Sequence, residues 1–303
     1  MLGWPLAHTL SPRLHQAAYR AAGLEGWRYL ARPTRPEELA AVLDEVRDGR
    51  LAGVNLTAPH KQAAVPLLDE LEPPACELGA VNTVWPSAGA AGEGPGRLGG
   101  GPAGAGEGPG RLVGGNTDVA GALWALERQL GLAGAGWSGE GPALLLGTGG
   151  VALAVALAWA RLAGGRRRRG LATSPLTVAG RSRARAERVA SHAGPGATTT
   201  GWAGAAGAVA TAAVLVQATT LTATGSPVPG QDRLRAGARV LDLNYGPAAQ
   251  GLVTAARLAG AAAAADGLGM LCAQAAEAVT RIAGVQPDVP AMAAAVGLTV
   301  PRT

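Results

Sequence analysis

A chain of 303 residues, 48% of them hydrophobic, is long enough to bury the cores of two domains. The formal net charge is +5. The two cysteines, Cys76 and Cys272, lie far apart and have no metal-ligand spacing, so we expect neither a disulfide scaffold nor a bound metal. We expect a reducing, cytoplasmic compartment. No signal-peptide pattern opens the chain, and the apolar stretch 151–160 is too short to span a membrane.

The N-terminal third alternates between helical and extended patterns. Pro12 and Gly23 bracket a helix at positions that helix ends favour, and Val42, Leu43 and Val46 would share one face of another. The predicted elements here are helices over 12–24, 36–48 and 61–71 and strands over 51–56 and 80–85.

Residues 87–111 consist mostly of Gly, Ala, Pro and Ser, and the run of residues 92–98 recurs at 106–112. A segment with so little to bury predicts a flexible surface loop. A lid over a binding site is the alternative, which the composition favours less.

Beyond this loop, strand and helix patterns alternate. The predicted helices cover 117–130, 150–162, 184–192, 251–258 and 270–283, and the predicted strands cover 143–146, 176–179, 213–217 and 240–243. Because strand and helix patterns alternate throughout the chain, we expect an α/β fold with a parallel sheet covered on both faces. The run Arg166–Arg169 falls in a predicted loop, where a charge run is usually a solvated face. Because aromatic side chains are not interleaved with the basic ones, we expect no nucleic-acid partner.

The strongest local pattern is an apolar strand that runs into a glycine-rich turn and then into an apolar helix, over residues 144–152. Glycines there let the backbone approach a pyrophosphate closely, and the N-terminus of the helix supplies N–H groups and a positive dipole end. In a chain with 47 glycines this turn is weak evidence by itself, and an ordinary strand-to-helix connection is the alternative.

The end of the next predicted strand indicates which dinucleotide the turn favours. An NAD site has an acidic residue there for the ribose hydroxyls, whereas this chain has Gly180, Arg181, Ser182 and then Arg185. Arginine at a helix N-terminus opposes the helix dipole, so a bound 2′-phosphate explains these residues better than a basic, solvated helix start. The sequence therefore favours NADP.

Polar groups in the N-terminal part fit a substrate site. Thr9 and Ser11 place two hydroxyls just before a predicted helix, where a carboxylate can be held, and an N-cap role would explain only one of them. Lys61 is the only lysine in an arginine-biased chain, and a lysine can lose its proton, although a surface lysine is the alternative. Asp118 opens a predicted helix, where it is either a helix-start acid or, near Lys61, half of a proton-transfer pair.

The chain resembles the shikimate dehydrogenase family in segments that follow the family's order, HTLSP, GVNLTAPHK, GAVNTV, GGNTD, LGTGGVA, GRSRARA, LDLNYGP and GLGMLCAQ. The resemblance covers nearly the whole chain, and the joint occurrence is far more specific than any one segment. It implies the NADPH-dependent, reversible reduction of 3-dehydroshikimate to shikimate, within chorismate and aromatic amino acid biosynthesis.

The resemblance also implies roles for individual residues. Lys61 would be the catalytic acid/base, with Asp118 as its partner. The substrate-binding residues would be Thr9, Ser11, Thr57, Asn82, Asp118, Tyr245 and Gln274. The cofactor-binding residues would be Gly147, Thr148, Gly149, Gly150, Val151, Gly180, Arg181, Ser182, Arg185, Leu243 and Gly267.

We expect two α/β domains with a central cleft. Residues 1–115, completed by C-terminal helices within 268–303, would form the substrate-binding domain, and residues 116–267 a Rossmann-type NADP-binding domain. The chain departs from the family pattern before Gly3, where most of the first strand is absent, and at Gly180 and Gly246, where the family usually has Asn. Loss of that strand would destabilise the substrate domain, and a misassigned start codon is one explanation.

Two alternatives stay open beside this interpretation. One is a quinate/shikimate dehydrogenase that uses NAD(P), and the other is a catalytically silent NADP-binding relative. Arg181 argues against NAD, and Lys61 and Asp118 argue against a silent relative. The sequence does not give the oligomeric state, so a homodimer also stays open.

Overall fold

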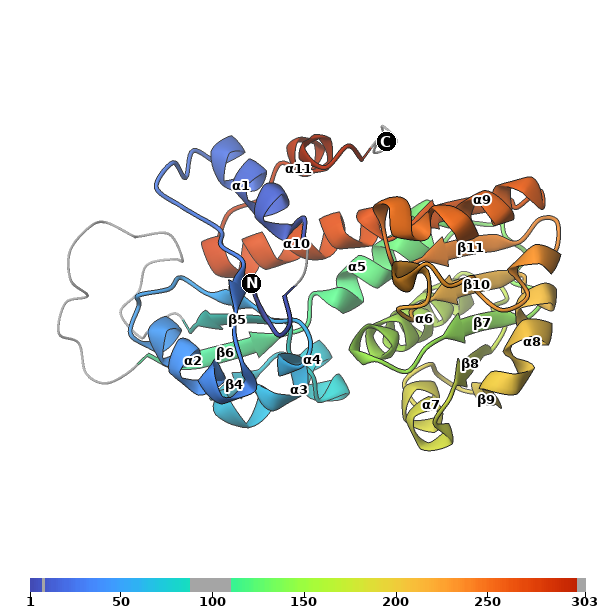
Figure 1. Ribbon diagram of the computed structural model, residues 1–303, viewed down its shortest axis with the longest axis horizontal. Coiled ribbons are helices and arrows are strands. Elements are labelled where there is room, and N and C mark those ends of the chain that lie inside the picture. The colour runs from blue at the N-terminus through green and yellow to red at the C-terminus, as the bar shows by residue number, and fades with distance from the viewer. Residues whose placement is uncertain (7–8, 88–109, 299–303) are drawn as a thin grey trace. The chain divides into compact units, whose positions relative to one another are not determined.

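The computed structural model describes residues 1–6, 9–87 and 110–298. It divides by internal contacts into two compact units, one with a six-stranded sheet and the other with a four-stranded and a two-stranded sheet (Figure 1). The N-terminal unit comprises Met1–Thr117 and Cys272–Thr303, and the central unit comprises Asp118–Leu271. Nearly all of the predicted loop 87–111 lies outside the described residues.

The central unit contains a six-stranded, entirely parallel sheet in the order β12-β11-β10-β7-β8-β9. Its strands are β7 (Ala143–Leu146), β8 (Leu176–Gly180), β9 (Thr198–Gly201), β10 (Val214–Gln217), β11 (Arg239–Asp242) and β12 (Ala263–Asp266). The strand order reverses between β7 and β10, which makes this a doubly wound, Rossmann-type sheet and confirms the predicted parallel arrangement. Two of these strands, β9 and β12, escaped prediction because runs of Thr and of Ala lack a distinctive apolar pattern.

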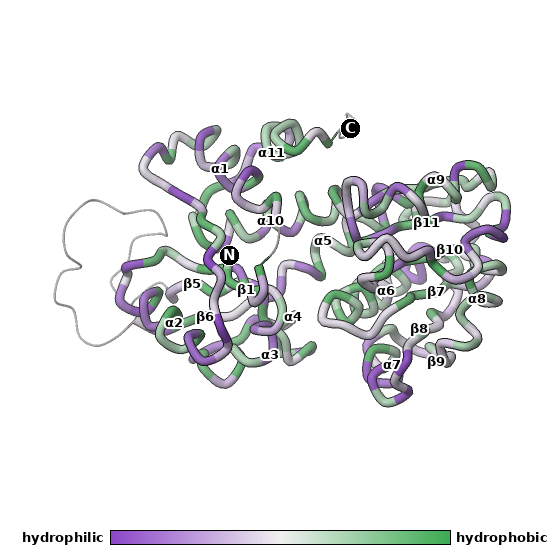
Figure 2. Tube along the Cα trace, viewed as in Figure 1, coloured by the Kyte–Doolittle hydropathy of each residue, from purple (hydrophilic) through white to green (hydrophobic). Residues whose placement is uncertain are grey.

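Helices accompany the strands of the central sheet. They are α5 (Asp118–Trp124), continued by a π turn (Ala125–Gln129), α6 (Gly150–Arg168), α7 (Arg183–Ala190), α8 (Ala205–Thr211) and α9 (Gln250–Leu258), with short 3₁₀ turns at Trp202–Gly204, Thr222–Thr224, Gln231–Arg233 and Gly246–Ala249. One buried cluster joins Leu144 and Leu146 of β7 to Val209 of α8 and Leu252 of α9. In contrast to these helices, α7 is hydrophilic over much of its length (Figure 2).

The arginine run corrects the sequence-based expectation. α6 continues through Arg166 to Arg168, and Arg166 is only 1% exposed rather than part of a solvated loop. Its guanidinium donates to the carbonyls of Ala172 (2.8 Å), Leu132 (2.8 Å), Gly134 (2.7 Å) and Trp137 (2.8 Å). A planar group with five N–H donors can satisfy four loop carbonyls at once, which explains how this charge is accommodated in the interior.

The sheet of the N-terminal unit is mixed, so the expectation of parallel strands throughout is wrong here. Its order is β3-β5-β6-β4, with β5 antiparallel to both β3 and β6 and β4 parallel to β6. The strands are β3 (Val54–Asn55), β4 (Glu70–Leu71), β5 (Thr83–Pro86) and β6 (Leu112–Gly115). The predicted helix 61–71 is instead α3 (His60–Ala63), a 3₁₀ turn (Val65–Leu67) and β4, because Pro66 cannot continue an α-helix.

The first strand of the N-terminal unit is only two residues long and belongs to a separate two-stranded sheet. β1 (Leu2–Gly3) pairs in parallel with β2 (Arg32–Pro33), and Leu2 also bridges Leu56. Leu2 is 2% exposed and belongs to the buried cluster that includes Val46. The remaining helices are α1 (Ser11–Ala21), a 3₁₀ turn (Pro36–Glu38) leading into α2 (Leu39–Arg47), α4 (Pro73–Leu78), α10 (Leu268–Ala283) and α11 (Val289–Ala295).

Candidate functional site

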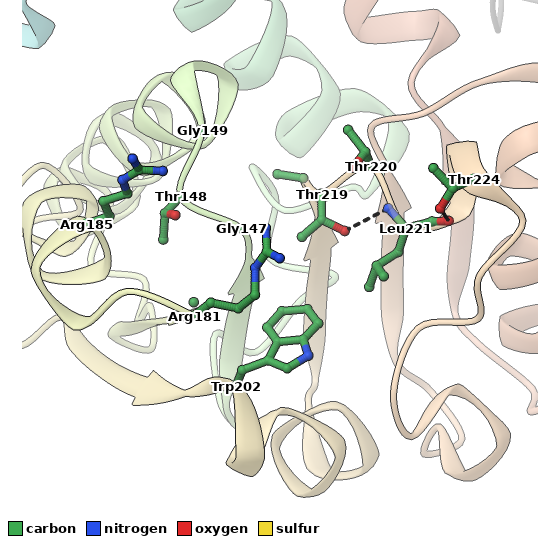
Figure 3. Close-up of a pocket in the computed structure, with 12 residues that line it drawn as sticks. Gly147, Thr148, Gly149, Arg181, Arg185, Trp202, Thr219, Thr220, Leu221 and Thr224 are labelled. Carbon is green, nitrogen blue, oxygen red and sulfur yellow. Dashed lines mark hydrogen bonds between the residues drawn. The ribbon is translucent and has the colours of Figure 1, made fainter.

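A cavity of about 410 Å³ opens at the carboxyl ends of β7, β8 and β10, where the strand order of the central sheet reverses (Figure 3). Open α/β sheets bind ligands at this position. Its lining consists of Gly147, Thr148, Gly149, Gly180, Arg181, Arg185, Trp202, Ala218, Thr219, Thr220, Leu221 and Thr224. The cavity therefore unites the predicted glycine turn with the predicted arginines.

The backbone itself requires glycine in this turn. Gly147 has a φ of 118°, and a Cβ there would lie 2.8 Å from the carbonyl oxygen of Ala218. A Cβ at Gly180 would lie 2.5 Å from Cγ2 of Thr148, so the glycine at position 180 leaves room for the threonine of the turn. α6 begins at Gly150, and the N–H groups of its first turn are the ones that a helix leaves without an intrahelical acceptor.

The arginines that follow β8 differ in their surroundings. Arg181 and Arg185 line the cavity, whereas Arg183 pairs with Glu187 at 2.7 Å on the surface. Ser182 is the N-cap of α7, where its hydroxyl accepts from the backbone N–H of Arg185. No acidic side chain stands among the described residues that line the cavity.

The other residues predicted to bind the cofactor lie outside this lining. Gly150 and Val151 form the first turn of α6, and Ser182 caps α7. Leu243 follows β11 and Gly267 follows β12. The two backbones lie so close together that a Cβ at Gly267 would overlap the carbonyl of Leu243.

Asn244, which the sequence reasoning did not single out, ties together two loops of the central unit. Its side-chain amide donates to the carbonyl of Thr219 (2.9 Å) and to the hydroxyl of Thr222 (2.7 Å). Asp242 beside it accepts from the Asn244 backbone N–H, and burial raises the pKa of this carboxyl. Since Thr219 lines the cavity, Asn244 fixes one of its walls.

In the N-terminal unit, a polar network connects two predicted substrate-binding residues, Asn82 and Gln274. The Asn82 amide donates to the hydroxyl of Thr117 at 3.0 Å, and that hydroxyl lies 3.2 Å from Oε1 of Gln274. Asn55 donates to Thr83 at 3.0 Å, and Thr83 donates to Asn82 at 3.0 Å. Asn55, Thr83 and Thr117 were not predicted, although all three lie in the segments that carry the family resemblance.

A second group of hydroxyls surrounds the start of α1. Thr9 lies 3.2 Å from Ser11, and the phenol of Tyr29 hydrogen-bonds both Ser11 and Oδ1 of Asn55, the latter at 2.8 Å. The ring of His15 stacks on Tyr29 with 3.9 Å between centroids, and burial, together with the nearby N-terminal ammonium, lowers the pKa of His15 to about 3. This group is rich in neutral hydrogen-bond donors, and no sequence pattern pointed to Tyr29.

The two predicted catalytic residues, Lys61 and Asp118, lie in the helices α3 and α5. Lys61 is the second residue of α3, its carbonyl accepts from the N–H of Val81 at 2.7 Å, and its side chain is half-buried. Asp118 is 7% exposed at the start of α5, directly after Thr117. Thr57 is half-buried three residues before α3, and Tyr245 is half-buried after β11.

Two other kinds of feature are absent from the described ranges. No three or more His, Cys, Asp or Glu side chains gather there in a way that could hold a metal ion. Within the same ranges, no helix has the length and apolar character needed to cross a membrane.

Comparisons with known proteins agree along almost the whole chain. Residues 1–84 match the family model of the shikimate dehydrogenase substrate binding domain. The shikimate dehydrogenase (NADP(+)) of Methylocella silvestris is 35% identical over 95% of this chain and 91% of that protein, and its namesake from Citrifermentans bemidjiense is 36% identical over 93% and 88%. The solved structure of shikimate 5-dehydrogenase from Thermus thermophilus in complex with NADP(H) and shikimate has a TM-score of 0.70 and 32% identity, covering 98% of this chain and 97% of that one.

Proposed function

This chain belongs to the shikimate dehydrogenase family, and we propose that it catalyses the NADPH-dependent, reversible reduction of 3-dehydroshikimate to shikimate. The observation that carries the proposal is the cavity at the reversal of strand order, where a glycine turn, Arg181 and Arg185 converge. The central unit would bind NADP, and the N-terminal unit would bind the substrate.

The residues of the cavity fit an NADP dinucleotide. Gly147 allows close backbone approach, and the first turn of α6 offers N–H groups to a pyrophosphate. Arg181 and Arg185 provide positive charge for a 2′-phosphate, and the lining offers no carboxylate to bind the ribose hydroxyls of NAD. When bound, NADPH supplies the hydride for reduction of the C3 ketone.

The polar groups of the N-terminal unit fit a hydroxylated carboxylic acid. Thr9 and Ser11 would donate to the carboxylate from the start of α1. Asn82 and Gln274, held by the hydroxyl of Thr117, would bind the ring hydroxyls, together with Thr57 and Tyr245. Because the network of Asn82 is already formed, substrate binding would order few additional side chains.

The chain must also supply a proton to the oxygen at C3 in the direction of reduction. Lys61 would donate that proton, and Asp118 would orient the ammonium and bind a substrate hydroxyl. In the reverse direction the neutral Lys61 amine would accept the proton of the C3 hydroxyl. General acid–base assistance of this kind typically contributes about 10²–10⁴-fold to a rate.

The proposal includes a cytoplasmic location, which the two free cysteines support. It also includes a homodimer as the assembly to be tested by sedimentation. The proposed reaction does not depend on the homodimer, because every residue named above comes from one chain.

The direct experiment measures initial rates with shikimate and with quinate, each with NADP⁺ and with NAD⁺. We expect the highest kcat/KM for shikimate with NADP⁺. A higher value for quinate or for NAD⁺ would assign the chain to the broader quinate/shikimate class, and binding of NADP⁺ without turnover of either acid would contradict the enzymatic proposal.

A further inference from the structure

One aromatic side chain lines the cavity at the carboxyl ends of β7, β8 and β10. Trp202 lines the cavity with Arg181 and Leu221, and Figure 3 draws its indole on the cavity wall next to the loop that contains Thr219. It is half-buried, and it packs against the buried cluster of the central unit that includes Val209. One part of the ring is therefore fixed by the core while another part borders the cavity.

The position of Trp202 in the sheet indicates which part of a dinucleotide it would meet. In a doubly wound sheet the turn after the first strand takes the pyrophosphate, and the end of the next strand takes the ribose of the adenosine half. Here these are the ends of β7 and β8, and β9 is the next strand outward. Trp202 is the first residue after β9.

The chemistry of the lining at this end suits a purine. An adenine needs flat or apolar surfaces against its faces, and indole is the largest such surface among the side chains. The planar guanidinium of Arg181, which follows β8, is also able to stack on a base. Ala218, Leu221 and three threonines of the lining belong to the loop after β10, on the other side of the glycine turn that contains Thr148.

We propose that Trp202 provides the surface on which the adenine ring of NADP stacks, and so contributes to binding of the adenosine half only. The inference rests on the proposed function, because it presumes a dinucleotide in this cavity. A residue that served only the core would need no contact with the cavity, and Leu at position 202 would then serve as well.

The test uses half-cofactors, so that binding is measured without catalysis. Adenosine 2′,5′-bisphosphate and nicotinamide mononucleotide are titrated by calorimetry into the wild type, Trp202→Leu, Trp202→Phe and Trp4→Leu. Stacking of one base on an aromatic ring typically contributes about 1–3 kcal/mol, which corresponds to a loss of about 5–150-fold in affinity. We expect this loss for adenosine 2′,5′-bisphosphate in Trp202→Leu, less than about threefold in Trp202→Phe, and unchanged affinity for nicotinamide mononucleotide.

The control replaces Trp4, which is 42% exposed and belongs to the N-terminal unit, so it removes a tryptophan without touching the cavity. Fluorescence gives a second measurement that does not depend on whether Trp202→Leu folds. Adenosine 2′,5′-bisphosphate should quench tryptophan emission in the wild type and in Trp4→Leu, and this quenching should disappear in Trp202→Phe.

Two results would overturn the inference while leaving the proposed function intact. One is wild-type affinity of Trp202→Leu for adenosine 2′,5′-bisphosphate, and the other is undiminished quenching in Trp202→Phe, in each case with a wild type that oxidises shikimate with NADP⁺. Failure of the proposed function would look different, because the wild type itself would then not oxidise shikimate with NADP⁺, whatever its affinity for adenosine 2′,5′-bisphosphate.

Discussion

Replacing the buried guanidinium of Arg166 by an alkyl chain should destabilise the central unit strongly. In Arg166→Leu, four backbone carbonyls lose donors that now lie at 2.7–2.8 Å. A net contribution of about 1 kcal/mol for each hydrogen bond gives a loss of about 4 kcal/mol. A hydrogen bond to a charged group typically contributes more, about 1.5–3 kcal/mol. The value for a neutral bond applies here because the substitution also removes the cost of burying the charge. For a unit of this size the loss corresponds to a fall in Tm of about 8–16 °C.

The assay is urea unfolding followed by far-UV circular dichroism, with Arg167→Leu as the matched control. Arg167 is the next residue of the same helix and is exposed, so its replacement should change the free energy of unfolding by less than about 0.5 kcal/mol. Arg166→Lys should fall between the two, since one ammonium cannot reach all four carbonyls. Arg166→Leu with the stability of Arg167→Leu would refute the assignment of Arg166 as the donor that organises these loops.

Three further outcomes follow from the structure. Tyr29→Phe removes the hydroxyl that donates to Asn55. We expect KM for shikimate to rise several-fold with a smaller change in kcat, and the free energy of unfolding to fall by about 1–3 kcal/mol. Unchanged kinetics would show that this hydroxyl has no part in substrate binding. Arg181→Ala should reduce the preference for NADP⁺ over NAD⁺ in calorimetric titrations by about 10–100-fold, whereas Arg183→Ala, which removes only a surface pair with Glu187, should leave it unchanged. Burial lowers the pKa of His15 to about 3, from about 6.5 in the unfolded chain, so between these pH values the unfolded chain binds a proton that the folded chain does not. The free energy of unfolding that arises from this difference should be complete above pH 6.5 and should be lost as the pH falls toward 3. The slope of unfolding free energy against pH should be lower in His15→Gln by up to about 1.4 kcal/mol per pH unit, and equal slopes would mean that His15 is protonated in the folded state.

The sequence predicted best those elements whose pattern is both local and apolar. Leu144–Leu146 followed by Gly147 gave the central strand and the nucleotide turn, because a buried parallel strand must be apolar along its whole length. The strands of Thr198–Gly201 and Ala263–Asp266 were missed, since runs of Thr and of Ala lack a distinctive apolar pattern. The burial of Arg166 was missed for a different reason: three of its four acceptors come from the loop after Leu130, which no pattern around Arg166 reveals.

The candidate site shows the same division. Residues next to a turn or a helix start, such as Arg181 and Ser11, could be named from position and chemistry together with the family resemblance. Tyr29 and Trp202 could not, because each reaches its site only through tertiary packing: Tyr29 by stacking on His15, and Trp202 by packing on the core beyond β9. Large aromatic residues in a chain with 3% aromatics are the one signal that would have drawn attention to both.

The most direct test of the proposed chemistry is the rate of shikimate-dependent NADP⁺ reduction, followed at 340 nm, in the wild type and in Lys61→Ala. We expect the wild type to turn over and the variant to lose most of its kcat while it still binds shikimate with an affinity close to that of the wild type. Equal kcat values in the two proteins would show that Lys61 transfers no proton, and absence of turnover in the wild type would contradict the proposed reaction itself.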